Sequence, residues 1–276
     1  MIESEMVKSN PELPRTLYLR FTDESLGFAR YDAGELLPFY YSNYKFRPQT
    51  SLVVNLRNAV SEEPLLAAPA ISTHVLVNGP VTLVPLSEFQ EEDGAKIYDH
   101  LFPTEKLHRV FYETIPSTSS VLLFSLEETI CATFDSLFDR VVYHSSFTPV
   151  LRHFSRKNAT LLGTSAKRVF IYGHEKGIEV AIFDENRLVM FNGFPLLRAA
   201  DAAYFVFNMV HFLSEQPTVL SYYVAGNLEL RDQIVSEMQK FAKNVYSLNP
   251  SAEFNRHPVT QVDSDVPYDL ITYFAE

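Results

Sequence analysis

The stretch from Arg168 to Gly226 constrains the fold of this chain more than any other. It begins with three short runs rich in β-branched and aromatic residues, joined by tight polar turns, which is typical of an antiparallel meander. The next apolar residues have the spacing of a helix with one apolar face: Ala202, Phe205, Val206, Met209, Val210 and Leu213. A strand pattern returns over Val219 to Val224. Three strands, a crossover helix and a further strand predict a layered α/β domain.

The first half of the chain repeats this order. Three β-like runs come first: Thr16 to Phe21, Leu26 to Tyr31 and Glu35 to Tyr44. The third run contains Pro38, which cannot donate to a sheet, so an edge strand is predicted there. A helix pattern over Leu52 to Val60 follows, capped by Thr50 or Ser51. His74 to Val77 and Val81 to Val84 read as a strand pair around the turn signal Asn78-Gly79.

Further patterns complete the predicted organisation. Ser125 and Glu128 form a capping box that predicts a helix to about Phe138, and another helix is predicted over Phe147 to Phe154. The polar stretch Ser155 to Lys167 is the predicted linker. The expected division is therefore a tail over 1–15, a first domain over 16–160 and a second over 161–276. Apolar spacing predicts a C-terminal helix over Pro267 to Phe274.

Composition excludes several classes of protein. The 276 residues carry 23 Lys and Arg against 34 Asp and Glu, a net charge of −11, and no basic run interrupts them, so neither nucleic acid nor an anionic membrane surface is an expected partner. The single Cys131 cannot form an internal disulfide. Met1 to Pro14 has no apolar core typical of a secretory signal, and no window resembles a membrane span. We expect a cytoplasmic protein.

Two successive units of three strands, helix, strand and helix are the plan of the actin-like ATPase fold. The chain resembles the bacterial DUF3822 family, from Arg15 to Phe274, through four short fragments: Thr82-Leu83-Val84-Pro85, Asn192-Gly193-Phe194, Asp201-Ala202-Ala203-Tyr204 and Val224-Ala225-Gly226. This resemblance implies a two-domain α/β fold of the duplicated RNase H-like, actin-like type. It leaves the biochemical activity open.

The resemblance also implies where a nucleotide would bind. ATP-hydrolysing proteins of this fold place an acid and a glycine in the first hairpin of each half, because backbone amides approach the phosphates and a carboxylate holds the metal. Here the first hairpin has Asp23 but Ser25 where the glycine is expected, and the second has Gly173 and Gly177 without an aspartate. On the adenine side, nucleotide-binding proteins of this fold usually have consecutive glycines after the strand, whereas here only Gly226 is present, followed by Asn227. These motifs predict a degenerate site; no catalytic or metal-binding residue is assigned.

Two functions of different class remain. The first is a non-hydrolysing interaction or scaffold protein that needs no cofactor and binds a protein partner, which can be a second copy of the chain. Its candidate partner-binding residues are Tyr41 and Tyr44, on the aromatic edge strand. The alternative interpretation is purely structural: both tyrosines pack inside the protein, against the core or beneath another segment of the same chain. The second function is a divergent Mg-ATP-binding protein or ATPase, in which Asp23 holds the metal and Gly226 meets the base.

Overall fold

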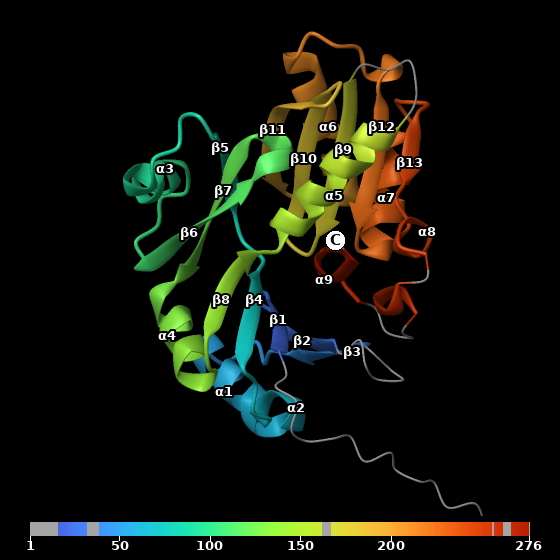
Figure 1. The fold of residues 1–276 in the computed structure, drawn as a ribbon. Coiled ribbons are helices and arrows are strands. Elements are labelled where there is room, and N and C mark those ends of the chain that lie inside the picture. Colours follow the sequence, from blue (N-terminus) through green and yellow to red (C-terminus); the bar gives the residue numbers. More distant parts are fainter. Residues whose placement is uncertain (1–15, 32–38, 162–166, 256, 262–265, 276) are drawn as a thin grey trace, which may run out of the picture.

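Two five-stranded sheets of the same topology organise the chain (Figure 1). The computed structural model describes residues 16–31, 39–161, 167–255, 257–261 and 266–275. One sheet has the order β3 (Phe39–Lys45), β2 (Ser25–Tyr31), β1 (Thr16–Phe21), β4 (Ser72–Val77), β8 (Val141–Ser145). The other has the order β11 (Arg187–Pro195), β10 (Gly177–Asp184), β9 (Lys167–His174), β12 (Ser221–Gly226), β13 (Val245–Ser247). The predicted two-part α/β architecture is confirmed.

Strand pairing is also repeated between the halves. In each sheet the first three strands form an antiparallel meander, and the remaining two pair in parallel. Helices supply the crossovers that parallel pairing requires. The register places Tyr18 opposite His74 in one sheet and Gly173 opposite Gly226 in the other.

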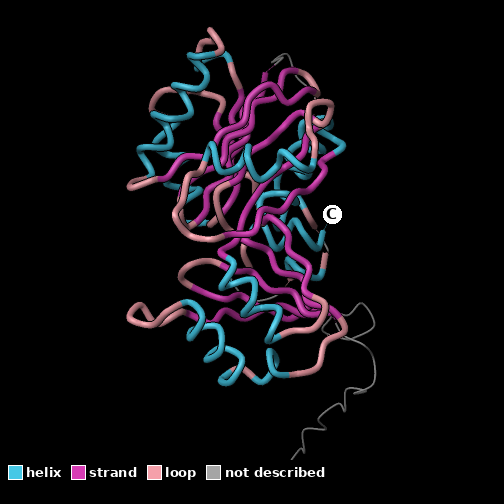
Figure 2. Tube along the Cα trace, turned by 90° about the vertical axis from the view of Figure 1, so that its left-hand side faces the viewer, coloured by secondary structure: helices cyan, strands magenta, loops and turns pink. Residues whose placement is uncertain are grey.

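Helices cover both sheets and extend between them. α1 (Leu52–Glu62), α2 (Pro64–Ala67) and α4 (Glu128–Leu137) pack on one face of the first sheet, and α9 (Tyr268–Ala275) packs on the other. α6 (Ala199–Phe212) and α7 (Leu228–Met238) cover the outer face of the second sheet. α5 (Phe147–Thr160) shares a single apolar core with both sheets. In the side view the strands of the two halves lie one above the other, with helices beside them (Figure 2). The short helix α8 (Pro250–Glu253) follows β13.

A third sheet is inserted between β4 and β8. Its order is β5 (Val81–Pro85), β7 (Ser120–Glu127), β6 (His108–Ile115), and α3 (Gly94–Leu101) covers one face. The predicted hairpin between His74 and Val84 is therefore wrong. β4 has β1 on one side and β8 on the other, so no edge remains for β5, which pairs with β7 instead.

Several predicted boundaries change in the structure. Ser125 lies within β7 opposite Val110, and α4 begins only at Glu128, so the capping box is wrong. α5 continues to Thr160, so the linker does not begin at Ser155. Residues 162–166 lie outside the described part of the chain, as does the predicted tail. Within the described ranges, four single 3-10 turns complete the assignment: Glu91–Asp93, Pro116–Thr118, Pro217–Val219 and Pro258–Thr260.

The aromatic edge strand and the C-terminal helix meet. β3 is an edge of its sheet, as predicted, although Pro38 falls outside the described residues. The helix predicted near the C-terminus is α9, and its Phe274 packs on buried Phe39 with ring centroids 5.0 Å apart. The last helix of the chain thus belongs spatially to the first sheet. None of the helices in the described part of the chain has the length and apolar character to cross a membrane.

Candidate functional site

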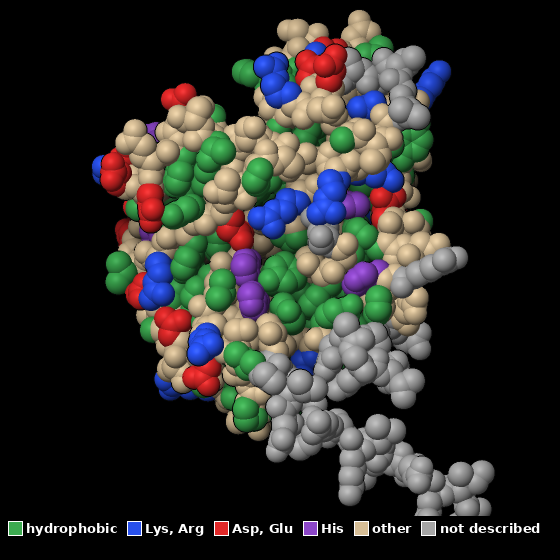
Figure 3. All heavy atoms as spheres, viewed as in Figure 1, with side chains coloured by type: hydrophobic (Ala, Val, Ile, Leu, Met, Phe, Trp, Pro, Cys, Tyr) green, Lys and Arg blue, Asp and Glu red, His purple; other side chains and the backbone are tan. Residues whose placement is uncertain are grey.

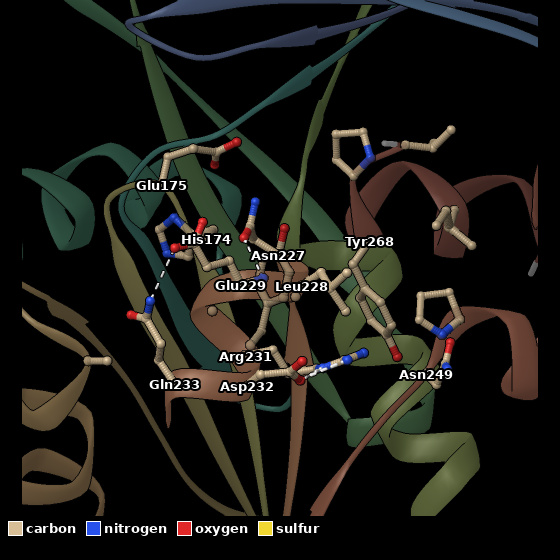
Figure 4. Close-up of a pocket in the computed structure, with 18 of the residues that line it drawn as sticks. His174, Glu175, Asn227, Leu228, Glu229, Arg231, Asp232, Gln233, Asn249 and Tyr268 are labelled. Atoms are coloured by element: carbon tan, nitrogen blue, oxygen red, sulfur yellow. Dashed lines mark hydrogen bonds and ion pairs between the residues drawn. The ribbon is translucent and has the colours of Figure 1, made fainter. Parts of the chain in front are cut away.

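A cleft of about 1300 Å³ lies between the two halves. One wall is formed by Ser25, Tyr41 and Asn43 of the first sheet. The facing wall comes from the end of β9 and from α7, and the N-terminal part of α9 closes a third side (Figure 4). Small-molecule pockets usually measure about 300 to 1,000 Å³, so this cleft is larger than one small ligand requires.

The wall of the second half is built where two neighbouring parallel strands end. β12 ends at Gly226, and Asn227 then caps α7, its Oδ1 accepting hydrogen bonds from Glu229 N at 3.1 Å and Leu230 N at 3.3 Å. One face of α7 presents polar groups to the cleft: Glu229, Asp232, Gln233, Ser236 and Glu237. Arg231 is buried and donates to the Leu248 carbonyl at 3.0 Å. Three carboxylates on one helix face give this wall an acidic character.

The glycines of this wall are explained by packing. Gly226 has φ of +119°, and a Cβ added there would overlap the carbonyl oxygen of Gly173 on the adjacent strand. A Cβ at Gly173 would press on Ile234 and Leu230 of α7 at 3.3 Å. A Cβ at Gly177 would overlap the backbone of Phe194 in β11. These glycines therefore have a structural reason to be present that involves no ligand.

Arg20 joins the two halves at the base of the cleft. Its Nη1 and Nη2 donate to the two oxygens of Glu175, at 2.7 and 2.9 Å, in a bidentate pair that links β1 to the β9–β10 hairpin. Its Nε lies 2.7 Å from Asp269 Oδ2 in α9. Arg20 is 4% exposed and Asp269 fully buried, so their contact is shielded from water, whereas the Glu175 side chain is 39% exposed. Asn78 Nδ2 also donates to Glu175, at 2.9 Å.

A second ion pair connects the two hairpins nearer the surface. Lys176 Nζ lies 2.6 Å from Asp23 Oδ2. Asp23 and Lys176 come from the first hairpin turns of the first and second halves, where a nucleotide-binding protein of this fold would hold phosphate and metal. We call the contacts of Arg20 with Glu175 and of Asp23 with Lys176 the hairpin clamp. In the clamp each hairpin carboxylate already faces a cation of this chain.

Burial and charge shift the ionisation of the network. Burial lowers the pKa of the Arg20 guanidinium, but Asp269 and the other anionic partners outweigh that effect and raise it. Burial raises the pKa of the Glu175 carboxyl. Its hydrogen bonds to Arg20 and the charge of Arg20 lower the pKa and outweigh burial, so the net shift is downward. Burial raises the pKa of Asp269, with Arg20 opposing the shift. Glu175 is therefore held ionised by Arg20.

Comparison with known proteins places this architecture in a family. The family described as "Protein of unknown function (DUF3822)" matches residues 8–245. The chain belongs to the DUF3822 family. No curated protein sequence matches it. The predicted resemblance to this family is thus confirmed.

Solved structures similar to this DUF3822 protein share its fold. A Bacteroides thetaiotaomicron protein with an actin-like ATPase fold and unknown function superposes with a TM-score of 0.76 at 19% identity, covering 94% of this chain and 95% of that one. The PilM-PilN type IV pilus biogenesis complex matches with a TM-score of 0.56 at 13% identity, covering 94% and 97%. At these identities the similarity establishes the actin-like ATPase fold of this DUF3822 protein.

The structure brings some of the predicted site residues together. Gly173, Gly226 and Tyr41 all line the cleft. Asp23 and Gly177 are not among its described lining residues; Asp23 lies in the hairpin clamp, and Gly177 packs against β11. Tyr44 donates its hydroxyl to Glu62 of α1 at 2.9 Å and packs partly on the main core. The nucleotide-binding and partner-binding roles of these residues stay predictions.

Sequence reasoning missed Arg20, Glu175, Lys176 and Asp269. A signal was present, because Arg20 is the single charged residue of its strand and Asp269 the single charged residue of α9 over Tyr268–Ala275. Buried charges are retained when they are paired, so each implied a partner elsewhere. The pairing itself spans 249 residues and could not be read from local spacing. In the described residues no group of three His, Cys, Asp or Glu side chains could hold a metal ion.

Proposed function

We propose that this DUF3822 protein is a non-hydrolysing interaction protein that receives a protein partner in the cleft between its halves. The hairpin clamp carries the proposal. Glu175 and Asp23 lie in the first hairpin turns of the two halves, and Arg20 and Lys176 neutralise them at hydrogen-bond distance. A phosphate and its metal would have to break both contacts and separate the buried Arg20 from the Glu175 carboxylate.

The size and composition of the cleft support a protein partner. It is larger than most small-molecule pockets and combines tyrosines with hydrogen-bonding side chains, a composition common at protein interfaces. Tyr41 lies on its wall beside Asn43, both on β3. PilM, a protein of the same fold, is found in a complex with PilN. By analogy of fold alone, we propose that the present chain also acts by binding another protein.

The alternative is a divergent Mg-ATP-binding protein that uses Asp23 and Gly226. It needs the clamp to open, which is why the clamp distinguishes the two functions. We also propose that the protein is cytoplasmic and that its partner can be a second copy of the same chain. The proposed division of the chain is a tail over 1–15, a first domain over 16–160 and a second domain over 161–276.

Nucleotide binding and partner binding can be tested in one design. A photocrosslinking amino acid at position 41 should yield a discrete crosslinked protein in cells, whereas the same group at Tyr112 on the inserted sheet, 44% exposed, should not. Mg-ATP should leave the melting temperature of the purified protein unchanged and release no phosphate above a buffer blank. A ligand at 100 times its dissociation constant would add about 2.7 kcal/mol of stability. Stabilisation of that size, with phosphate release abolished by Asp23→Ala in a folded variant, would support the alternative.

A further inference from the structure

A row of hydrogen-bonding side chains crosses the first sheet on the face that α9 covers. Tyr273 Oη of α9 lies 3.1 Å from Nδ1 of His74 on β4, and the same nitrogen lies 2.9 Å from Nε2 of His144 on β8. Nδ1 of His144 lies 2.8 Å from Oε1 of Glu113 on β6. The two imidazole planes differ by only 1°. Figure 3 shows histidine side chains in contact at the waist of the molecule. We call these four residues the histidine row.

Glu113 fixes the direction of the hydrogen bonds. Its Oε2 accepts from the backbone N–H of Ser145 at 3.0 Å and from the hydroxyl of Thr148. An ionised carboxylate only accepts, so Nδ1 of His144 must carry a proton and donate it to Oε1. In a neutral His144 the opposite nitrogen, Nε2, is then a bare acceptor. His74 must therefore donate through Nδ1, and the Tyr273 oxygen, which lies near the same nitrogen, can only accept from that shared N–H. This leaves Nε2 of His74 as the free basic nitrogen of the row.

This arrangement has room for one additional proton and no more. A single proton occupies the 2.9 Å gap between the rings. When one proton is added at Nε2 of His74, the proton in the gap can pass to His144, whose charge then lies beside Glu113, and no hydrogen bond is lost. When a second proton is added, both rings present an N–H to the gap. Two donors cannot share that distance, so the row must break.

Side chains from the surrounding elements lie near His74 and His144 and influence their protonation. Tyr18 of β1 lies 5.4 Å from His74 between ring centroids, and Tyr273 lies 5.6 Å from His144. The Arg152 side chain of α5 reaches the Thr114 carbonyl beside Glu113, at 3.4 Å. Glu113 is the anion in direct contact with the pair, and Arg152 is the nearby cation. Burial first, and the charge of His144 second, lower the pKa of His74 below its usual 6.5.

We propose that the histidine row is an acid-sensitive latch that holds α9 in place and thereby controls one wall of the cleft. The row joins four elements at one point: β4 and β8 of the first sheet, β6 of the inserted sheet, and α9 through Tyr273. Tyr268 and Ile271 of α9 line the cleft. Tyr273 covers His74 from α9, so lifting this end of the helix returns the protonated imidazole to water and relieves the two facing N–H groups. The other end of the same helix forms this wall. The latch stands whether or not the cleft receives a partner.

The sign of the effect follows from His74. A base whose pKa is lower in the folded state binds protons more tightly when it is released, so folded α9 is favoured above about pH 6.5 and loses stability as the pH falls below it. The loss amounts to at most about tenfold in the opening equilibrium per pH unit. The effect ends once the pH has fallen through the pKa of His74 in the folded protein.

Hydrogen exchange of the α9 amides measures the latch, after correction for the intrinsic pH dependence of exchange. In the full-length protein their protection should fall between about pH 7.5 and about pH 5, up to tenfold per unit. His74→Asn keeps an amide donor near the position of Nδ1 but cannot titrate. It should keep the protection seen at pH 7.5 and lose the acid-dependent fall. His100→Asn, on an exposed histidine of α3, should leave the fall intact.

Nitrogen NMR of the imidazoles tests the same idea without a variant. At neutral pH, Nδ1 of His144 and Nδ1 of His74 should be protonated and both Nε2 atoms bare, with a scalar coupling across the gap between the rings. A bare Nδ1 on His144 would overturn the proposal, as would an acid-dependent fall that persists unchanged in His74→Asn. Should that variant fail to fold, the NMR result on the wild-type chain decides.

Discussion

Asp23 Oδ2 lies 2.6 Å from Lys176 Nζ, so the first hairpin of one half touches its counterpart in the other across 153 residues of sequence. In a nucleotide-binding protein of this fold the two hairpins would share the phosphates and metal. Here they contact each other, with Arg20 and Glu175 forming a second, more deeply buried link. The same positions thus serve to hold the two halves of the protein together.

Arg20 should dominate the stability of the contact between the halves. Arg20→Met leaves Asp269 buried without its cation, and we expect the free energy of unfolding to fall by about 3–5 kcal/mol. Lys176→Met removes only a solvent-exposed partner and should cost less than about 1 kcal/mol. Urea denaturation measures both. Arg20→Met combined with Asp269→Leu should recover part of the loss; a loss from Arg20→Met no larger than that from Lys176→Met would contradict this view.

Gly226 should tolerate no side chain. Gly226→Ala places a Cβ against the Gly173 carbonyl and forces an alanine to φ of +119°, so we expect a loss of about 2–4 kcal/mol in thermal or urea unfolding. Gly79→Ala is the matched control, since its Cβ would meet nothing closer than 4.0 Å. If Gly226→Ala were as stable as Gly79→Ala, the packing explanation of this glycine would be wrong.

Tyr41 and Tyr44 can be tested separately for partner binding. If the edge strand binds a partner through both tyrosines, each change to alanine weakens a pull-down or self-association while the melting temperature stays nearly the same. A partner confined to the cleft is affected by Tyr41→Ala alone, because Tyr44 is not among the described lining residues of the cleft. Tyr44 also bonds Glu62, so Tyr44→Phe is a useful second variant that removes the hydroxyl and keeps the ring. A loss of several kcal/mol of stability from each alanine variant, as for large-to-small changes in a core, would assign both tyrosines to packing.

His174 should titrate above its usual range because of Glu179. Burial lowers the pKa of His174, but the Glu179 carboxylate, 2.9 Å away, outweighs burial and raises it. This pair therefore stabilises the fold below about pH 6.5 and loses its contribution as the pH rises through the folded-state pKa, the opposite sign to His74. NMR titration should show a lower His174 pKa in Glu179→Gln and an unchanged one in Glu229→Gln. Equal pKa values in all three proteins would refute the assignment.

Local patterns determined most of the secondary structure. Alternation and β-branched residues located the meander of β9, β10 and β11, and the 3.6-residue spacing located α6 and α9. Ser51 was one of two predicted caps, and its side chain accepts from Val54 N. These features depend on neighbours along the chain, which is why they can be read from it. The repeated order of elements then predicted the two matching sheets.

Tertiary structure decided what the local signals left open. Asn78-Gly79 signals a turn, but only the occupation of both sides of β4 sends the next strand into a third sheet. Ser125 and Glu128 have capping-box spacing, yet pairing with β6 holds Ser125 in a strand. The site depended on the fold in the same way: Gly173, Gly226 and Tyr41 could be named from the sequence, whereas the partners of Arg20 lie 155 and 249 residues away. Charge pairing acts through space, so only the folded chain determines which carboxylates meet Arg20 and Lys176.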